Sequence, residues 1–196
     1  MTPFKEADAA RVRYLAVAEA KRLIDSSALD FRLLVQAALV TGARYGELAS
    51  LCVSDFNADI GTVHVRTSKS GKGRHIVLGD EGVAVFKSLV TSKSGEMRLL
   101  VKSDGTAWTK SLQARPMAEA CKRAKIEPEI SFHVLRHTWA SLAVMAGVPL
   151  LVVARNLGHA DTRMVEKHYG HLAPSYIVDA IRASGPRFGI ETDVIH

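Results

Sequence analysis

Apolar residues recur at intervals of three or four along much of the chain, which is the spacing of one face of an α-helix. The first two segments of this kind are 16–24 and 29–40, and Thr41-Gly42 closes the second, because glycine favours the end of a helix. A short helix is expected at 45–51, which places Arg44 in a tight turn between helices. Further helices are expected at 81–90, 112–124, 134–145, 150–157, 162–168 and 175–182.

The pattern changes between residues 53 and 78, where it becomes typical of β-strands. Two strand-like runs, 62–66 and 75–78, are separated by Ser, Gly and Lys residues at 68–73, which predicts a β-hairpin. In the C-terminal half, Gly158 is interpreted as a helix stop and Asp161 as the cap of the next helix. The predicted fold class is therefore mainly α with a small antiparallel β-sheet, an α+β fold.

Length and composition indicate one ordinary globular domain, since 47% of the 196 residues are hydrophobic and 23% are charged. Residues 1–13 mix charged residues with alanines and contain no apolar stretch typical of a secretory signal. The most apolar run, 139–154, is interrupted by Ser, Gly and Pro, so no membrane span is expected. The two cysteines, Cys52 and Cys121, lie far apart and suggest reduced thiols in a cytoplasmic protein.

Charge adds a candidate partner. The chain has 26 Lys and Arg residues against 20 Asp and Glu residues, a formal net charge of +6 that favours polyanions. Residues 61–79 contain Arg66, Lys69, Lys72 and Arg74 and no acidic residue. This segment is suited to meet a nucleic-acid phosphate backbone.

Four local patterns are candidates for chemistry, and each has an ordinary structural interpretation when taken alone. In T-G-A-R-Y-G-E-L at 41–48, Arg44 offers a planar fork for phosphate, yet it is also placed to pair with Glu47 on a solvated face. The lysines at 68–74 fit a solvated hairpin tip as well as a DNA contact. His133 and Arg136 are three residues apart, so on a helix they share one face.

The fourth pattern is L-G-H at 157–159 followed by Tyr169. Taken together, the candidates resemble in chain order the signature of the tyrosine recombinases, also called phage integrases: Arg44, Lys69, His133, Arg136, His159 and Tyr169. The words T-G-x-R-x-x-E-L, H-x-x-R-H and L-G-H match that family, and the resemblance covers about residues 12–172. It implies the mixed fold of that family's catalytic domain.

The resemblance also implies a domain organisation. Residues 1–173 are expected to form the catalytic domain, and 174–196 a C-terminal helix and tail that contacts another protomer. The family's N-terminal DNA-clamping domain is expected to be absent from this chain. One departure concerns the tyrosine, which follows His159 by ten residues where many members have nine, so Tyr176 is kept as an alternative nucleophile.

Transfer of a DNA phosphodiester passes through a phosphorus centre whose oxygens gain negative charge. Arg44 and Arg136 stay protonated and are expected to stabilise that charge, with a further hydrogen bond from His159. Tyrosine is a poor nucleophile as a neutral phenol, so Tyr169 needs a proton acceptor, for which His133 is the candidate.

The leaving 5′-oxygen needs a proton, and Lys69 on the hairpin tip is the expected donor. By resemblance, Glu47 supports the arginine site. Phosphate contacts outside the reaction centre are expected from three basic side chains: Lys72, Arg74 and Lys122. The resemblance implies that the product is a 3′-phosphotyrosyl link to double-stranded DNA and that the full-length protein acts as a tetramer on DNA.

Two other functions remain open. A type IB topoisomerase uses the same chemistry to relax supercoils as a monomer, and a catalytically idle module only binds DNA. A zinc site at His159, His168 and His171 is not expected, because no carboxylate or cysteine completes a recognisable ligand set. The sequence therefore predicts a metal-independent integrase domain without a cofactor.

Overall fold

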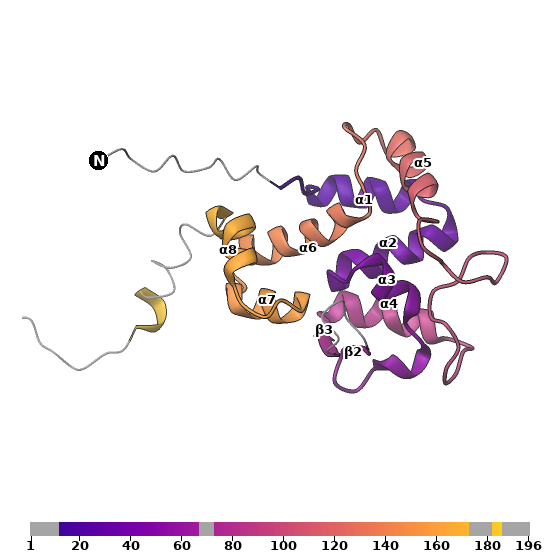
Figure 1. The fold of residues 1–196 in the computed structure, drawn as a ribbon, viewed down its shortest axis with the longest axis horizontal. Helices are drawn as coiled ribbons and strands as arrows, with labels where there is room; N and C mark the ends of the chain where they lie inside the picture. Colours follow the sequence, from indigo (N-terminus) through magenta and orange to yellow (C-terminus); the bar gives the residue numbers. More distant parts are fainter. Residues whose placement is uncertain (1–11, 67–72, 173–181, 186–196) are drawn as a thin grey trace, which may run out of the picture.

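Helices form most of the part of the chain that the computed structural model describes, residues 12–66, 73–172 and 182–185 (Figure 1). The α-helices are α1 (Val17–Ser26), α2 (Leu29–Thr41), α3 (Tyr45–Ser50), α4 (Asp80–Val90), α5 (Ala114–Ala124), α6 (His133–Met145), α7 (Leu150–Leu157) and α8 (Arg163–Tyr169). Two 3₁₀ turns, η1 (Val53–Asp55) and η2 (Gly170–Leu172), complete the helical elements. In these residues no helix combines the length and apolar character needed to cross a membrane.

The sheet has three short antiparallel strands in the order β1 (Phe56–Asn57), β2 (Thr62–Val65) and β3 (Arg74–Val77). Val63 pairs with Ile76, and both side chains are buried because alternate residues of β2 and β3 face the core. The predicted hairpin and the predicted fold class are thus confirmed. Strand β1 was not expected, because two residues are too few to show an alternating pattern.

The predicted helices lie within about two residues of those observed, and the left-handed φ of 76° at Gly158 confirms the helix stop. The expected cap of α8 is off by one residue. Thr162 is the capping residue, although the Asp161 carboxylate accepts a hydrogen bond from the backbone N–H of Arg163 at 3.1 Å. The hairpin turn at 68–73 falls mostly outside the described residues, as does the helix expected at 175–182.

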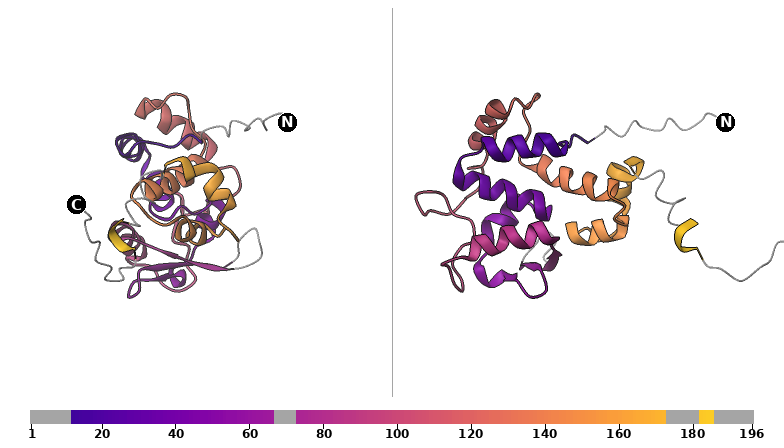
Figure 2. Two further views of the ribbon diagram at one scale, coloured as in Figure 1. Left: turned by 90° about the vertical axis from the view of Figure 1, so that its left-hand side faces the viewer. Right: turned by 180° about the vertical axis from the view of Figure 1, so that it is seen from behind.

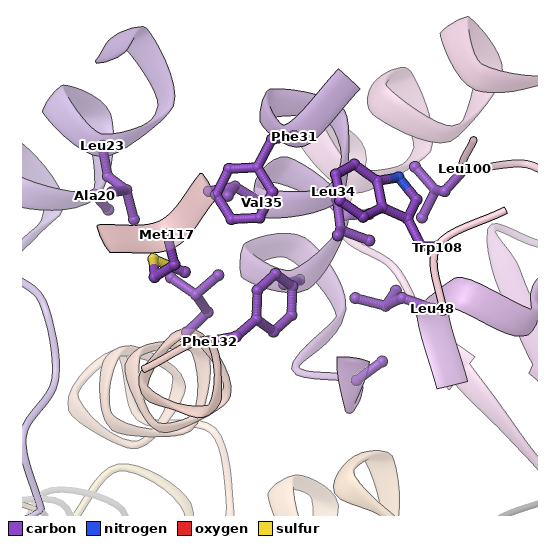
Figure 3. Close-up of a cluster of buried hydrophobic side chains, with 14 of the residues drawn as sticks. Ala20, Leu23, Phe31, Leu34, Val35, Leu48, Leu100, Trp108, Met117 and Phe132 are labelled. Carbon is purple, nitrogen blue, oxygen red and sulfur yellow. The ribbon is translucent and has the colours of Figure 1, made fainter. Parts of the chain in front are cut away.

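The main core lies between α1, α2, α4, α5, the sheet and the beginning of α6. Its aromatic centre is the Phe31 ring, whose centroid lies 5.9 Å from that of Trp108 and 6.3 Å from that of Phe132 (Figure 3). Apolar side chains from segments far apart in sequence surround these rings. This packing holds the first turn of α2 against the start of α6.

A second, smaller cluster holds the C-terminal helices. Helix α6 belongs to both clusters, since Leu135 is buried in the first while Ala140 and Val144 are buried in the second. It extends from the main body toward α7 and α8, which lie together on one side of the molecule in the front and rear views (Figures 1 and 2). The second cluster includes Tyr169, the candidate nucleophile.

Candidate active site

Arg136 joins the C-terminal ends of two helices. Its Nη1 donates to the carbonyl oxygen of Gly42, the residue that ends α2, and its Nη2 donates to that of Leu157, the last residue of α7, both at 2.8 Å. The last carbonyls of a helix lack partners within the helix and carry partial negative charge, so they suit a guanidinium. Arg136 is only 4% exposed, and these bonds compensate the burial of its charge.

Gly42 makes this approach possible. Its φ is 65°, a left-handed conformation that favours glycine, and a Cβ atom there would lie 2.8 Å from the Trp139 ring and 2.9 Å from Leu157. A larger residue would therefore push α6 and α7 away from the end of α2. The glycine that the sequence marks as a helix end also sets the spacing of the site.

His159 lies in the turn after α7, with its Nε2 3.0 Å from Nη2 of Arg136. Since arginine only donates, Nε2 accepts, and the proton of the neutral ring is on Nδ1. Burial, together with the positive charges of Arg136, Arg44 and Arg74, lowers the pKa of His159, so the neutral form prevails at neutral pH. Among the described residues, no acceptor contacts the buried Nδ1.

Arg44 caps the start of α3 and is part of a network centred on Glu47. Oε1 of Glu47 accepts from Nη1 of Arg44 at 3.0 Å and from Nη1 of Arg74 at 2.9 Å, while Oε2 accepts from Nη2 of Arg74 at 2.8 Å. Burial alone would raise the pKa of Glu47, but the hydrogen bonds and charges of the two arginines outweigh it and lower that pKa to about 2. Glu47 is therefore ionised and orients both guanidinium groups.

Arg74 connects the sheet to α7. Besides its two bonds to Glu47, its Nε donates to the carbonyl oxygen of Asn156 at 3.0 Å. The Asn156 side chain in turn accepts from the backbone N–H of Val77 in β3 at 2.9 Å. Glycine at position 158 leaves room for the Arg74 side chain, because a Cβ atom there would lie only 2.8 Å from Cδ of Arg74. These contacts hold the base of the hairpin against the end of α7.

A cavity of about 200 Å³ opens beside the arginines. It is lined by Ala43, Arg44, Tyr45, Gln113, Ser131, Phe132, His133 and Arg136. The side chain of Arg44 is 34% exposed, so it can reach a ligand from solvent. Desolvation and the charges of Arg136 and Arg44 lower the pKa of His133, so a neutral imidazole that can accept a proton lies next to two cations.

Tyr169 is the last residue of α8 and is only 3% exposed. Its hydroxyl lies 2.6 Å from Nδ1 of His137, which is one helical turn after His133 on α6. Burial raises the pKa of Tyr169 to about 12, although the charge of Arg136 opposes that rise. The hydroxyl is thus near the arginine group but does not line the cavity.

The structure brings together the predicted residues Arg44, Glu47, His133, Arg136 and His159, with Tyr169 close to them. Three others lie outside the described residues: Lys69, Lys72 and Tyr176. Lys122 is exposed on α5, which packs against α1. The DNA contact expected of Arg74 stays a prediction; in this structure its side chain is 10% exposed and bonded to Glu47 and Asn156.

Two contributors to the site were missed in the sequence. Asn156 shows no local signal, because its role depends on contacts with β3 and with Arg74. His137 was visible only as the last letter of H-x-x-R-H. For metal binding, no group of three or more His, Cys, Asp or Glu residues within 12–66, 73–172 and 182–185 is arranged to hold an ion.

A family model described as the phage integrase family matches residues 12–175. The chain belongs to this family. The integrase of Salmonella phage P22 is 32% identical, over 91% of this chain and 49% of the relative. Tyrosine recombinase XerA of Saccharolobus solfataricus is 28% identical, over 72% of this chain and 45% of the relative. The phage integrase chain described here thus spans about half the length of the curated relatives it matches.

Comparison with solved structures confirms the predicted fold class. The crystal structure of XerA recombinase is similar with a TM-score of 0.70 and 29% identity, over 91% of this chain and 67% of that one. The catalytic domain of bacteriophage HP1 integrase is similar with a TM-score of 0.67 and 28% identity, over 88% of this chain and 95% of that one. This phage integrase family member therefore has the fold of a tyrosine recombinase catalytic domain.

Proposed function

We propose that this chain is the catalytic part of a site-specific DNA recombinase that cleaves and rejoins DNA through a 3′-phosphotyrosine intermediate. The observation that carries the proposal is the pair of arginines, one buried and one partly exposed, beside a cavity that also holds a neutral histidine. Tyr169 contacts the same helix as Arg136, since its hydroxyl lies 2.6 Å from Nδ1 of His137, the next residue of α6. This arrangement suits a phosphodiester substrate and an oxygen nucleophile.

In the proposed reaction a DNA phosphate enters the cavity, and Arg44 and Arg136 neutralise the charge on its non-bridging oxygens. Oη of Tyr169 forms a bond to phosphorus as the bond from phosphorus to the 5′-oxygen breaks. The phenol proton goes to His133, whose lowered pKa leaves its ring free to accept. Lys69 supplies a proton to the leaving 5′-oxygen.

Rejoining reverses these steps with a 5′-hydroxyl of another strand as the nucleophile. The phosphotyrosyl bond keeps the energy of the original phosphodiester, so the exchange requires no ATP. Because fixed guanidinium groups neutralise the phosphate, the proposed mechanism also requires no metal ion.

The partner in this proposal is double-stranded DNA, as for XerH recombinase, a fold relative solved on a difH substrate before and after cleavage. We assign residues 1–173 to the catalytic domain and 174–196 to contact with another protomer, in a tetramer on DNA of the full-length protein. Lys72, Arg74 and Lys122 are proposed to contact phosphates away from the reaction centre. The chain is proposed to act in the cytoplasm, where its substrate lies.

The experiment that tests this function traps the intermediate. The purified chain is incubated in excess EDTA with nicked duplexes whose sequence is randomised around the nick, so that the released strand diffuses away after cleavage. A protein–DNA species that survives denaturing electrophoresis is expected, and sequencing its DNA gives the preferred site. An adduct that forms only when magnesium or zinc is added back would contradict the proposed chemistry.

The same purified chain and DNA distinguish the proposed function from the two alternatives. A recombinase joins the cleaved strand to the 5′-hydroxyl of a second duplex, whereas a type IB topoisomerase relaxes supercoiled plasmid without needing two sites. A chain that binds the duplexes but forms no adduct is an idle binding module, and the proposal is then wrong.

A further inference from the structure

Among the residues that the structure describes, the hydroxyl of Tyr169 makes one side-chain hydrogen bond, to a residue that the proposed reaction does not use. Nδ1 of His137 lies 2.6 Å away. The rings of His133 and His168 also neighbour this pair, with centroids 4.7 Å and 6.4 Å from that of His137. The hydrogen bond identifies His137, rather than His133 or His168, as the imidazole that contacts the hydroxyl of Tyr169.

Both members of the pair are uncharged at neutral pH. Burial, with the charges of His133, His168 and Arg136, lowers the pKa of His137 to about 4, and burial raises that of Tyr169 to about 12. The hydrogen bond therefore joins a neutral phenol to a neutral imidazole. Because both partners are uncharged, this hydrogen bond holds the tyrosine in its neutral, resting form.

The side chain of Tyr169 is also buried away from the cavity. Its side chain is 3% exposed and packs with Val153, Val165 and other residues of the small C-terminal cluster. The cavity beside Arg44 and Arg136 is lined by His133 but not by Tyr169. The hydroxyl therefore does not face the cavity in which we propose that the DNA phosphate binds.

We propose that His137 is a positioning residue that holds the hydroxyl of Tyr169 through Nδ1 in a buried resting place, and that this hydrogen bond breaks before attack on DNA. The inference rests on the proposed function for its catalytic consequence, but not for the contact itself. His137 and Tyr169 come from α6 and α8, which pack in the same small cluster. Breaking this contact involves only the end of α8 and its packing on α6, both outside the main core.

Chemical labelling tests the restraint without DNA. The full chain is acetylated with N-acetylimidazole, and the labelling rate of each tyrosine is read by peptide mass spectrometry. In His137→Leu the rate at Tyr169 is expected to rise about fivefold, the equilibrium effect of losing one neutral hydrogen bond. Tyr45, whose hydroxyl donates to the carbonyl oxygen of Thr109 at 2.7 Å, serves as the reference and should not change.

Two further variants separate restraint from general loosening. His137→Asn keeps a polar acceptor near the position of Nδ1 and is expected to return the labelling rate of Tyr169 toward that of the parent chain. His168→Leu removes a neighbouring imidazole that makes no hydrogen bond to Tyr169 and is the matched control. Equal labelling of Tyr169 in the parent and His137→Leu, or an equal rise in all three variants, would overturn the proposal.

Adduct formation on the nicked duplexes then gives the catalytic consequence. Because release precedes attack, His137→Leu is expected to form the adduct about fivefold faster than the parent chain, and His137→Asn to reverse that gain. A slower adduct in His137→Leu would overturn release as a step before attack. If the parent chain forms no adduct, the proposed function fails instead, and the labelling result still decides whether His137 restrains Tyr169.

Discussion

The two chemical halves of the site are held in different ways. On the arginine side, Arg136 is bonded to two helix-terminal carbonyls and to His159, and Glu47 is bonded to two guanidinium groups. On the tyrosine side, the hydroxyl of Tyr169 has one side-chain partner within the described part of the chain, His137. The groups proposed to stabilise charge on phosphorus are thus held by several charge-assisted hydrogen bonds, while the proposed nucleophile is held by a hydrogen bond between two uncharged groups.

Packing also differs between the two halves, although the end of α7 serves both: Leu157 is buried in the smaller cluster and its carbonyl oxygen accepts from Arg136. Helices α2 and α6 meet in the main core, whereas α7 and α8 share a cluster of seven buried residues among those described. A smaller buried apolar surface gives a lower free energy of local opening. The comparison shows that the proposed phosphate-binding groups are held by several buried hydrogen bonds, whereas the proposed nucleophile lies in the smaller cluster.

The largest effect is expected from removing the central cation of the arginine side. Arg136→Ala should slow adduct formation by a factor on the order of 10² to 10³, because a preorganised donor is lost. It should also lower the free energy of unfolding by about 3 kcal/mol, since two buried carbonyl groups lose their partner. Adduct kinetics and urea denaturation measure the two effects.

Arg44→Ala is the matched comparison, because Arg44 is partly exposed and contacts Glu47 rather than helix ends. We expect a similar loss of rate but a change of only about 1 kcal/mol in unfolding. If both variants lose equal stability, the structural role assigned to Arg136 is wrong.

The next effect concerns the leaving group. Lys69→Ala should slow adduct formation on ordinary DNA by a factor on the order of 10² and recover on a substrate with sulfur at the bridging 5′ position, because a thiolate leaves without a proton. Arg136→Ala should show no such recovery. Lys72→Ala tests which hairpin lysine donates the proton. If only Lys72→Ala recovers on the sulfur substrate, Lys72 and not Lys69 is the proton donor. If neither lysine variant recovers, His159 is the first alternative donor to test.

The Glu47 network should contribute to stability through burial. Glu47→Gln removes a buried carboxylate that pairs with Arg74 and Arg44, and we expect a loss of about 3 kcal/mol in the free energy of unfolding. Glu96, which pairs with Arg66 while 68% exposed, offers a matched surface pair. Glu96→Gln should leave the midpoint of urea denaturation nearly unchanged, and equal losses in the two variants would refute the distinction.

The smallest effect is the dependence of stability on pH. The folded-state pKa values of His133, His137 and His159 lie below the usual value for histidine, so the unfolded chain binds more protons below about pH 6.5. Stability should therefore fall as the pH falls from 6.5 toward 4, by at least about 1 kcal/mol between pH 7 and pH 5. The Glu47 contribution is lost only below about pH 4.5.

Urea denaturation at several pH values checks this sign. The His137→Leu variant should show a flatter profile, because one of the three groups no longer titrates. A parent chain that becomes more stable on acidification over this range would show that the histidines are not held neutral.

Much of the fold could be predicted from sequence because its signals are local. Helical periodicity and the glycines at 42 and 158 predicted most element ends, and the motif order identified the arginines. The pairing of Arg44 with Glu47 could be predicted from their spacing. The link from Glu47 to Arg74 could not, since Arg74 lies 27 residues away and its ion pair depends on how the sheet packs. The same holds for His137 and Tyr169, which are 32 residues apart.

The central claim is that Tyr169 supplies the oxygen that bonds to DNA, and peptide mapping of the trapped adduct tests it most directly. Nuclease-trimmed adduct from the parent chain is digested, and the residue that carries the nucleotide is located by mass spectrometry, with Tyr169→Phe and Tyr176→Phe treated in parallel. The account predicts a nucleotide on Tyr169, no adduct in Tyr169→Phe with DNA affinity nearly unchanged, and a normal adduct in Tyr176→Phe. A nucleotide on Tyr176, or an adduct that persists in Tyr169→Phe, would contradict it.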